Sequence, residues 1–260
     1  MNLLFIGDIV GHPGRMAVQK LLKTVQQEYA IDFTIANGEN AAGGNGITRD
    51  VAEELYRSGV NCLTSGNHIW DKKQVFEFID HDTKLIRPAN YPAGTPGRGF
   101  GLLQGPKNIM IGVANFSGRV FMPPLDDPFQ VANKAVTHLA AQTKVIFVDI
   151  HAEATSEKIA LGWFLAGRVS AVCGTHTHVQ TADERILPGG TAYISDVGMT
   201  GPRDSVLGVK TETIVNKFLT QLPVRFEVAG GTVQLNGVVV EVNESSGKAL
   251  SIVRVQKFLD

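Results

Sequence analysis

Carboxylate, amide and imidazole side chains follow the predicted β-strands of this 260-residue chain at the points where the strands end. The polar residues that come after these short apolar runs are Asp8, Glu39, Asn40, Asn67, His68, His151, His176 and His178. In an open α/β sheet the carboxyl ends of the parallel strands line one crevice. We therefore expect these groups, which separate strand ends deliver, to meet in one place.

This mixture of imidazole and carboxylate groups is typical of a transition-metal site. Histidine nitrogen and carboxylate oxygen together suit Fe, Mn, Zn or Co, and the lack of a thiolate argues against structural zinc. His176 and His178 are separated by one residue, which in an extended chain puts both on one side, about 7 Å from each other. They could each bind one of two neighbouring metals, with Glu39 bridging the pair. Two metals ~3.5–4 Å apart are a usual device for in-line displacement at phosphorus.

Taken singly, most of these residues have an ordinary structural explanation. Asp8 could be a turn former or helix cap, Asn67 could form an Asx turn, and a lone histidine could be a hydrogen-bonded core residue. Glu39 could be a solvated loop charge. The joint pattern favours a metal site, because so many polar groups are not expected at one sheet edge by chance. Asp149 lies near His151, and we expect it on the opposite strand face in a structural role.

Apolar strand-like runs alternate with helical patterns through the first two-thirds of the chain. Predicted strands cover 3–7, 33–36, 61–64, 101–104, 109–114, 145–150 and 169–174, and predicted helices cover 18–29, 49–58, 72–79, 131–141 and 156–165. This alternation predicts parallel strands joined by crossover helices. The last third, with strand patterns at 192–195, 224–228, 233–242 and 250–258 and one helix at 211–219, is predicted to be antiparallel. A single α/β domain over 1–260, with two packed sheets flanked by helices, fits this organisation best.

The composition excludes several classes of protein. Hydrophobic residues make up 43% and charged residues 19%, so the chain can bury a core and is not a disordered protein. The formal net charge of -1 gives no broad positive electrostatic potential that would bind nucleic acid or an anionic membrane. Cys62 and Cys173 cannot build a disulfide framework and are expected to be buried. Because no apolar run could span a membrane and MNLLFIGD lacks the basic segment of a signal peptide, we expect a cytoplasmic protein.

The order of the polar residues resembles that of the calcineurin-like metallophosphoesterase superfamily. The matching blocks are GDIV, NGEN, SGNHIW, DIHAE and GTHTH. The bacterial YmdB-like phosphodiesterases are the branch that the chain resembles most, and FSGRVFM at 116–122 and SDVGMTGPRDSVLG at 195–208 add to this resemblance. The resemblance covers nearly the whole chain and implies a four-layer α/β/β/α sandwich with a dinuclear metal centre. It also implies activity on small phosphodiesters, with 2′,3′-cyclic nucleotides as the substrate class.

The sequence departs from the superfamily pattern at three positions. Val10 stands in place of a metal-binding histidine, Glu39 in place of an aspartate bridge, and Ile69 in place of an acidic residue. In the YmdB-like branch, the asparagine beside the bridge, here Asn40, fills the place of the missing histidine. The departures therefore point to this branch.

The resemblance also implies a role for each site residue. One metal would take Asp8, Glu39, Asn40 and His178, and the other would take Glu39, Asn67, His151 and His176. The implied cofactors are two transition-metal ions per chain, iron first and manganese second, bridged by a hydroxide that acts as the nucleophile. His68 adjoins a ligand but is spare in both sets, so it is the expected proton donor to the leaving oxygen. Arg119, within FSGRVFM, is an expected phosphate contact.

Two other functions are compatible with the same residues. The scaffold could serve a phosphomonoesterase or nucleotidase, and the size of the pocket beyond the metals would decide between these functions and a phosphodiesterase. The chain could instead be a regulatory protein of RNA turnover, with an RNA-processing partner and a secondary metal site. The balanced charge argues against strong nucleic-acid binding, and a homo-oligomer is compatible with the sequence.

Overall fold

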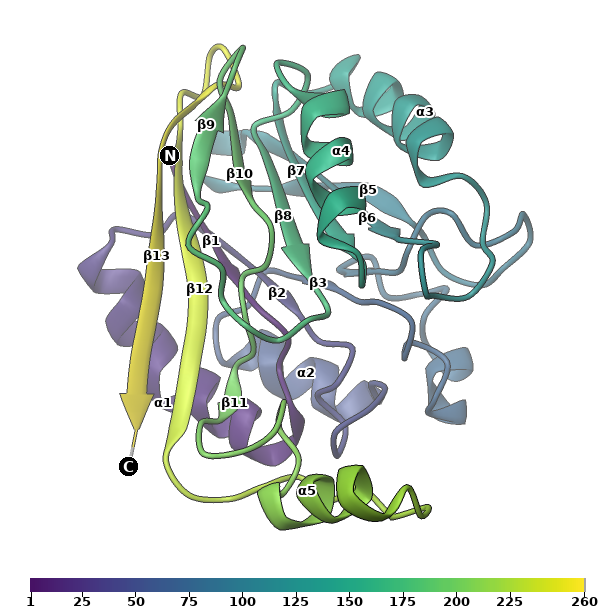
Figure 1. Ribbon diagram of the computed structural model, residues 1–260. Coiled ribbons are helices and arrows are strands. Elements are labelled where there is room, and N and C mark those ends of the chain that lie inside the picture. The colour runs from purple at the N-terminus through teal and green to yellow at the C-terminus, as the bar shows by residue number, and fades with distance from the viewer. Residues whose placement is uncertain (260) are drawn as a thin grey trace.

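A computed structural model, which describes residues 1–259, places two β-sheets face to face at the centre of the protein (Figure 1). The first sheet has seven strands, namely β1 (Asn2–Ile6), β2 (Phe33–Asn37), β3 (Cys62–Thr64), β4 (Leu85–Ile86), β11 (Gly201–Pro202), β12 (Val233–Val242) and β13 (Ala249–Leu259). Their order is β11-β12-β1-β2-β3-β4, and β13 pairs with β12. Strands β1 to β4 are parallel, so their carboxyl ends share one edge.

The second sheet has six strands, namely β5 (Phe100–Gln104), β6 (Met110–Ser117), β7 (Val145–His151), β8 (Ala171–Thr175), β9 (Arg185–Leu187) and β10 (Thr191–Ile194). Their order is β5-β6-β7-β8-β10-β9. The four inner strands are parallel, and antiparallel β5 and β9 form the edges. Because His151 at the end of β7 contacts Glu39, which follows β2, the parallel strands of both sheets end at the same side of the molecule.

Helices cover the outer faces of the two sheets. The α-helices are α1 (Gly11–Glu28), α2 (Arg49–Arg57), α3 (Pro128–Ala140), α4 (Thr155–Leu165) and α5 (Thr211–Thr220), and the 3₁₀ helices are η1 (Lys73–Glu77) and η2 (Pro106–Asn108). Helices α1 and α2 pack on the seven-stranded sheet, and α3 and α4 pack on the six-stranded sheet. Helix α5 lies at the lower edge of the molecule in Figure 1, apart from both helix layers.

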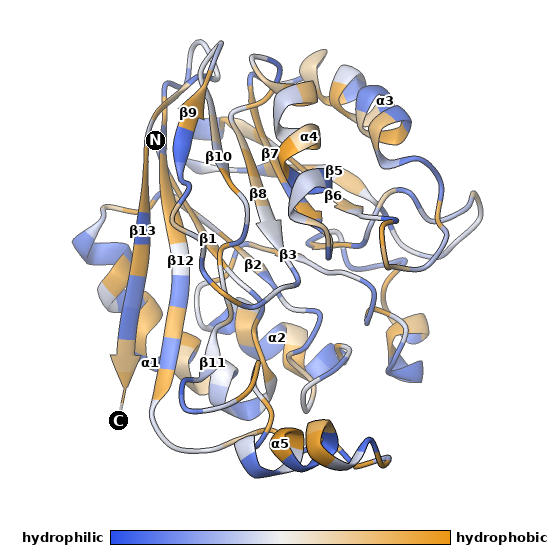
Figure 2. Cartoon of the chain, in the orientation of Figure 1, coloured by the Kyte–Doolittle hydropathy of each residue, from blue (hydrophilic) through white to orange (hydrophobic). Residues whose placement is uncertain are grey.

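The alternation of side chains along β1 shows how the layers are joined. Leu3 and Phe5 point into the space between the sheets, where the ring of Phe5 lies 4.8 Å from that of Phe147. Leu4 and Ile6 point to the opposite face, into the core beneath α1 and α2. A third core lies beneath α3 and α4. In Figure 2 the inner strand β7 is largely hydrophobic, whereas β9 and β13 carry hydrophilic stretches. Three apolar interfaces therefore join four layers, which confirms the predicted α/β/β/α sandwich.

Most predicted elements are present, and the differences have local causes. Residues 224–228 do not form the predicted strand: they are largely exposed, and within residues 1–259 their strand-like pairing is limited to one isolated bridge between Val209 and Val228. Strand β10 runs parallel to β8, so the prediction of an antiparallel last third is wrong for this strand. The helix predicted at 72–79 is present as the shorter 3₁₀ helix η1, Lys73–Glu77. Cys62 and Cys173 are free and buried, which confirms the prediction.

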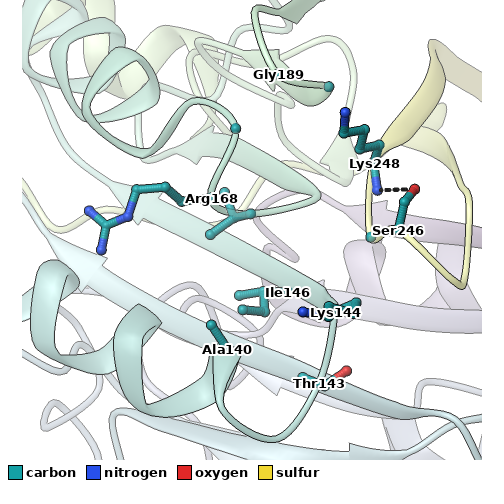
Figure 3. Close-up of a pocket in the computed structure, with 12 residues that line it drawn as sticks. Ala140, Thr143, Lys144, Ile146, Arg168, Gly189, Ser246 and Lys248 are labelled. Carbon is teal, nitrogen blue, oxygen red and sulfur yellow. Dashed lines mark hydrogen bonds between the residues drawn. The ribbon is translucent and has the colours of Figure 1, made fainter.

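A small hollow of about 180 Å³ lies at the amino ends of β7 and β8, opposite the polar strand ends. Lys144, Arg168 and Lys248 border it. Figure 3 shows the guanidinium of Arg168 turned away from Lys248, so these cations do not converge on one ligand. The groups that could do chemistry lie at the carboxyl ends of the strands instead.

Candidate metal centre

The carboxyl ends of β1, β2, β3, β7 and β8 bring the predicted site residues together. The residues gathered there are Asp8, Glu39, Asn40, Asn67, His68, His151, His176 and His178. Asp8, Glu39 and His151 are fully buried, whereas His68 is partly exposed. Each strand end thus contributes to one polar cluster inside an otherwise apolar sandwich.

His151 lies at the centre of the more compact half of this cluster. Its Nε2 atom is 3.0 Å from Oδ1 of Asn67, 3.1 Å from Oε1 of Glu39 and 3.0 Å from Nδ1 of His176. Ligand atoms of Glu39, His151 and His176 all lie within 4.8 Å of one another. A transition-metal ion could be held by these three groups together with the amide oxygen of Asn67.

Asp8, Asn40 and His178 form the other half. The Nε2 atom of His178 is 3.9 Å from Oδ1 of Asp8 and 3.4 Å from Nδ2 of Asn40. The same amide nitrogen donates to Oε1 of Glu39 at 3.0 Å, so Glu39 touches both halves. Coordination by Asn40 would require the amide to turn by about 180°, because its oxygen, and not its nitrogen, is the metal ligand.

Two observations indicate that these residues fit a cation. Asp8 Oδ1 is buried and has no hydrogen-bond partner among the described residues, although such atoms are normally satisfied. Burial raises the pKa of Asp8 in spite of the nearby histidines, and a bound cation would offset this cost. At Gly66, a Cβ atom would lie 2.2 Å from Glu39 Oε2 and 2.4 Å from His151 Nε2. The backbone therefore leaves the ligand atoms free of any side chain at this position.

The buried charges of the cluster shift the pKa values of its members. Burial favours a higher pKa for Glu39, but the charge and hydrogen bond of His151 outweigh it and lower this pKa to about 2. Burial favours a lower pKa for His151, but the charges of Glu39 and Asp8 raise it to about 9. Burial and the charge of His151 lower the pKa of His176 to about 3. The buried carboxylates thus keep a proton on His151, and a bound cation would take its place.

A hydrogen-bonded chain orients the ring of His151. Its Nδ1 atom lies 2.9 Å from Thr175 Oγ1, which donates its own proton to Asp149 Oδ1 at 2.8 Å. Asp149 accepts a second hydrogen bond from Thr64 Oγ1 at 2.6 Å. The hydroxyl of Thr175 can therefore accept from Nδ1–H, which leaves Nε2 as the ring atom that faces the candidate metal and would bind it once its proton is displaced. The prediction that Asp149 faces away from His151 is wrong, because residues two apart on a strand share a face.

A turn, not an extended strand, carries His176 and His178. Their φ angles of 99° and 65° are left-handed, so the predicted extended spacing is wrong. Asp196 holds the turn by accepting from the backbone N–H of Thr177 at 3.0 Å and from its hydroxyl at 2.7 Å. Lys158 of α4 lies 2.7 Å from Asp196, and both side chains are 1% exposed. This buried ion pair stabilises a backbone that is unfavourable for residues other than glycine.

Replacing Lys158 with methionine should destabilise the protein and weaken metal binding together. Lys158→Met leaves the carboxylate of Asp196 buried without a cation, and breaking a buried pair from one side costs about 3–5 kcal/mol. Urea titration measures the free energy of unfolding, and metal titration measures the effect on the two histidines. The control is Lys257→Met, which removes a partly exposed pair with Glu28 and should change that free energy by less than about 1 kcal/mol. Equal stability of the two variants would show that the buried pair does not hold the turn.

His68 lies beside the cluster but makes different contacts. Its backbone N–H donates to Glu39 Oε2 at 3.1 Å, and its ring Nδ1 lies 2.8 Å from Asp71 Oδ2. The ring also lines an open cavity and is 39% exposed. Since Asp71 engages Nδ1, the other ring nitrogen is available to a ligand in the cavity. Asp71 is absent from the predicted site residues, although a carboxylate three residues after a histidine is a recognisable signal.

Two further side chains lie near the rim. Glu153 Oε2 is 3.1 Å from Nε2 of His176, so the Nδ1 atom of that ring faces His151. The sequence analysis gave Glu153 no role. The guanidinium of Arg119 lies 3.3 Å from Asp127, and Arg119 is not among the residues that line the cavity. A contact of Arg119 with phosphate stays a prediction.

Comparison with known proteins supplies the family. The model of the YmdB-like protein family matches residues 4–255. This chain belongs to that family. A family relative from Bacillus subtilis, named 2′,3′-cyclic-nucleotide 2′-phosphodiesterase, is 53% identical over 255 residues, which cover 98% of this chain and 96% of the relative.

Two solved structures share the whole fold. A hypothetical protein from Thermus thermophilus aligns with a TM-score of 0.91 at 41% identity and covers 99% of both chains. A structure described as a novel phosphatase from Mycoplasma pneumoniae aligns with a TM-score of 0.93 at 34% identity, covering 99% of this chain and 93% of its own. Both confirm the family fold. Within residues 1–259, no helix of this chain is long and apolar enough to cross a membrane.

Proposed function

We propose that this protein is a metal-dependent phosphodiesterase that opens 2′,3′-cyclic nucleotides and leaves the phosphate on the 3′ oxygen. The observation that carries the proposal is the grouping of Glu39, His151 and His176, because Glu39 and His176 also line an open cavity that a phosphate ester can enter. The name of the Bacillus subtilis relative supports both the substrate class and cleavage at the 2′ oxygen.

Two sets of side chains would hold two transition-metal ions, iron or manganese. One set is Asp8, Glu39, Asn40 and His178, and the other is Glu39, Asn67, His151 and His176. When bound, such ions stabilise charge on the phosphoryl oxygens and lower the pKa of water. Glu39 belongs to both sets, which agrees with its contacts to Asn40 and His151. The buried carboxylates of Asp8 and Glu39 supply the negative charge that two cations require.

His68 would act as the proton donor to the leaving oxygen. Its ring lines the cavity, and Asp71 holds Nδ1 so that Nε2 can face the ester. The backbone contact with Glu39 fixes the position of His68 relative to the metal ligands. A histidine held in this way can protonate a ribose alkoxide as the bond to phosphorus breaks.

The protein should hydrolyse bis-p-nitrophenyl phosphate faster than p-nitrophenyl phosphate at equal concentrations. The cavity has a volume of about 550 Å³, so it has room for a second ester group. Release of p-nitrophenolate at saturating manganese measures both rates. A clear preference for the monoester would favour a phosphomonoesterase, in line with the word phosphatase in the description of the Mycoplasma pneumoniae structure.

A further inference from the structure

The cavity beside the metal centre has two unlike halves. One half is polar and contains Glu39, Asn40, His68, His176 and His178. The other part of the lining, which we call the apolar wall, consists of Val206, Leu207, Val209, Ile214, Phe218 and Phe226, with Lys217 beside it. A ligand that fills the cavity must therefore place a polar group at the metal centre and an apolar group against this wall.

Helix α5 and the segments before and after it build the apolar wall. Ile214 is buried and anchors the helix, whereas Phe218 and Phe226 are 73% and 52% exposed. The segment that carries Phe226 is tied back to the body by hydrogen bonds from Lys210 N–H to Glu227 and from Ala229 N–H to Gly208. The wall is thus attached to the site at a defined position. Orange residues along α5 in Figure 2 mark its hydrophobic character.

The exposed rings of Phe218 and Phe226 suit a planar aromatic ligand. Solvent-exposed aromatic side chains next to a polar site are typical of surfaces on which bases stack. The ammonium of Lys217 lies 4.5 Å from the ring centroid of Phe226 and adds a cation at the edge of the wall. The cavity volume of about 550 Å³ falls within the ~300–1,000 Å³ typical of small-ligand sites.

We infer that Phe218 and Phe226 bind the nucleobase of the substrate. The protein would then prefer a phosphodiester that carries a purine or pyrimidine over the same ribose cyclic phosphate without a base. This inference rests on the proposed function, because it assigns the apolar half of the cavity to the part of a nucleotide farthest from the phosphorus. Phe218 and Phe226 are specificity-determining residues in this assignment.

The test compares adenosine 2′,3′-cyclic phosphate with methyl riboside 2′,3′-cyclic phosphate, which has no base. For Phe218→Ala and Phe226→Ala, the ratio of the two kcat/KM values should fall about tenfold, the effect expected when one stacking partner is lost. The loss should appear in KM and not in kcat, and Phe226→Tyr should restore the ratio. Leu219→Ala is the control, because Leu219 is 79% exposed on the same helix but does not line the cavity. It should leave the ratio unchanged.

Several results would overturn the inference. If the ratio is unchanged in both phenylalanine variants, or if kcat/KM falls equally for both substrates, the wall does not bind the base. If a phenylalanine variant has a different oligomeric state, measured as molecular mass in solution, but an unchanged ratio, the wall is a contact between copies of the chain. If the wild-type protein hydrolyses neither cyclic phosphate, the proposed function fails. Binding of adenosine 3′-phosphate, measured by calorimetry on wild type and Phe218→Ala, then decides the inference by itself, since equal affinities would overturn it.

Discussion

Replacing Glu39 with glutamine should strip metal from the protein and remove its phosphodiesterase activity. Glu39 contacts both halves of the cluster, through His151 on one side and Asn40 on the other. Glutamine keeps the shape of the side chain but removes the charge that a cation requires. The loss of metal affinity should exceed the roughly 10–100-fold loss typical of an outer-shell partner. Elemental analysis after dialysis against a weak chelator measures the ions per chain.

The matched control for this substitution is Glu53→Gln. Glu53 lies on the surface of α2, pairs with Arg57 and does not line the cavity beside the metal centre. This variant should keep the full metal content and activity. Full occupancy and activity in Glu39→Gln would remove Glu39 from the metal site, and with it the proposal of a shared ligand.

Replacing His68 with alanine should leave metal bound but slow the reaction on nucleotides. His68 belongs to neither ligand set, and its half-exposed ring faces the cavity with Asp71 behind it. A proton donor to the leaving oxygen contributes typically about 10²–10⁴-fold to the rate, so kcat for adenosine 2′,3′-cyclic phosphate should fall at least ~10²-fold. The fall should be smaller for a p-nitrophenyl diester, because nitrophenolate leaves without protonation. Asp71→Asn should give the same pattern with a smaller loss.

Two results would contradict this role. If His68→Ala loses metal, His68 is a ligand. If it slows both leaving groups equally, the ring stabilises charge on the phosphoryl group and does not donate a proton.

The strand ends explain why so much of the site could be predicted. Asp8, Glu39, Asn67 and His151 each follow an apolar run, and parallel strands with crossover helices must bring such residues to one sheet edge. The same alternation predicted the two flanked sheets. The hydrophobic pattern of each strand was enough to predict these sheets. A shift of one residue in strand pairing would move the apolar side chains to the wrong face, so burial fixes the register.

The errors arose where contacts between distant segments decide the structure. The turn at His176 and His178 depends on Asp196 and Lys158, which lie far apart in the sequence and meet only in the folded chain. Among the described residues, the alternating pattern at 224–228 pairs with the chain through one isolated bridge and not with a strand, so it stays a loop, and its Phe226 becomes part of the apolar wall. Asp149 could have been placed from the sequence, because it is two residues from His151 on one strand.

The most direct measurement is the identity of the product formed from adenosine 2′,3′-cyclic phosphate. The purified protein is first freed of metal with a chelator and then assayed with and without added manganese or ferrous iron. The product is resolved by chromatography and by phosphorus NMR. We expect adenosine 3′-phosphate to form only when metal is added and not at all with Glu39→Gln. Metal-independent hydrolysis, or no hydrolysis of the cyclic ester by a protein that cleaves monoesters, would contradict the proposed function.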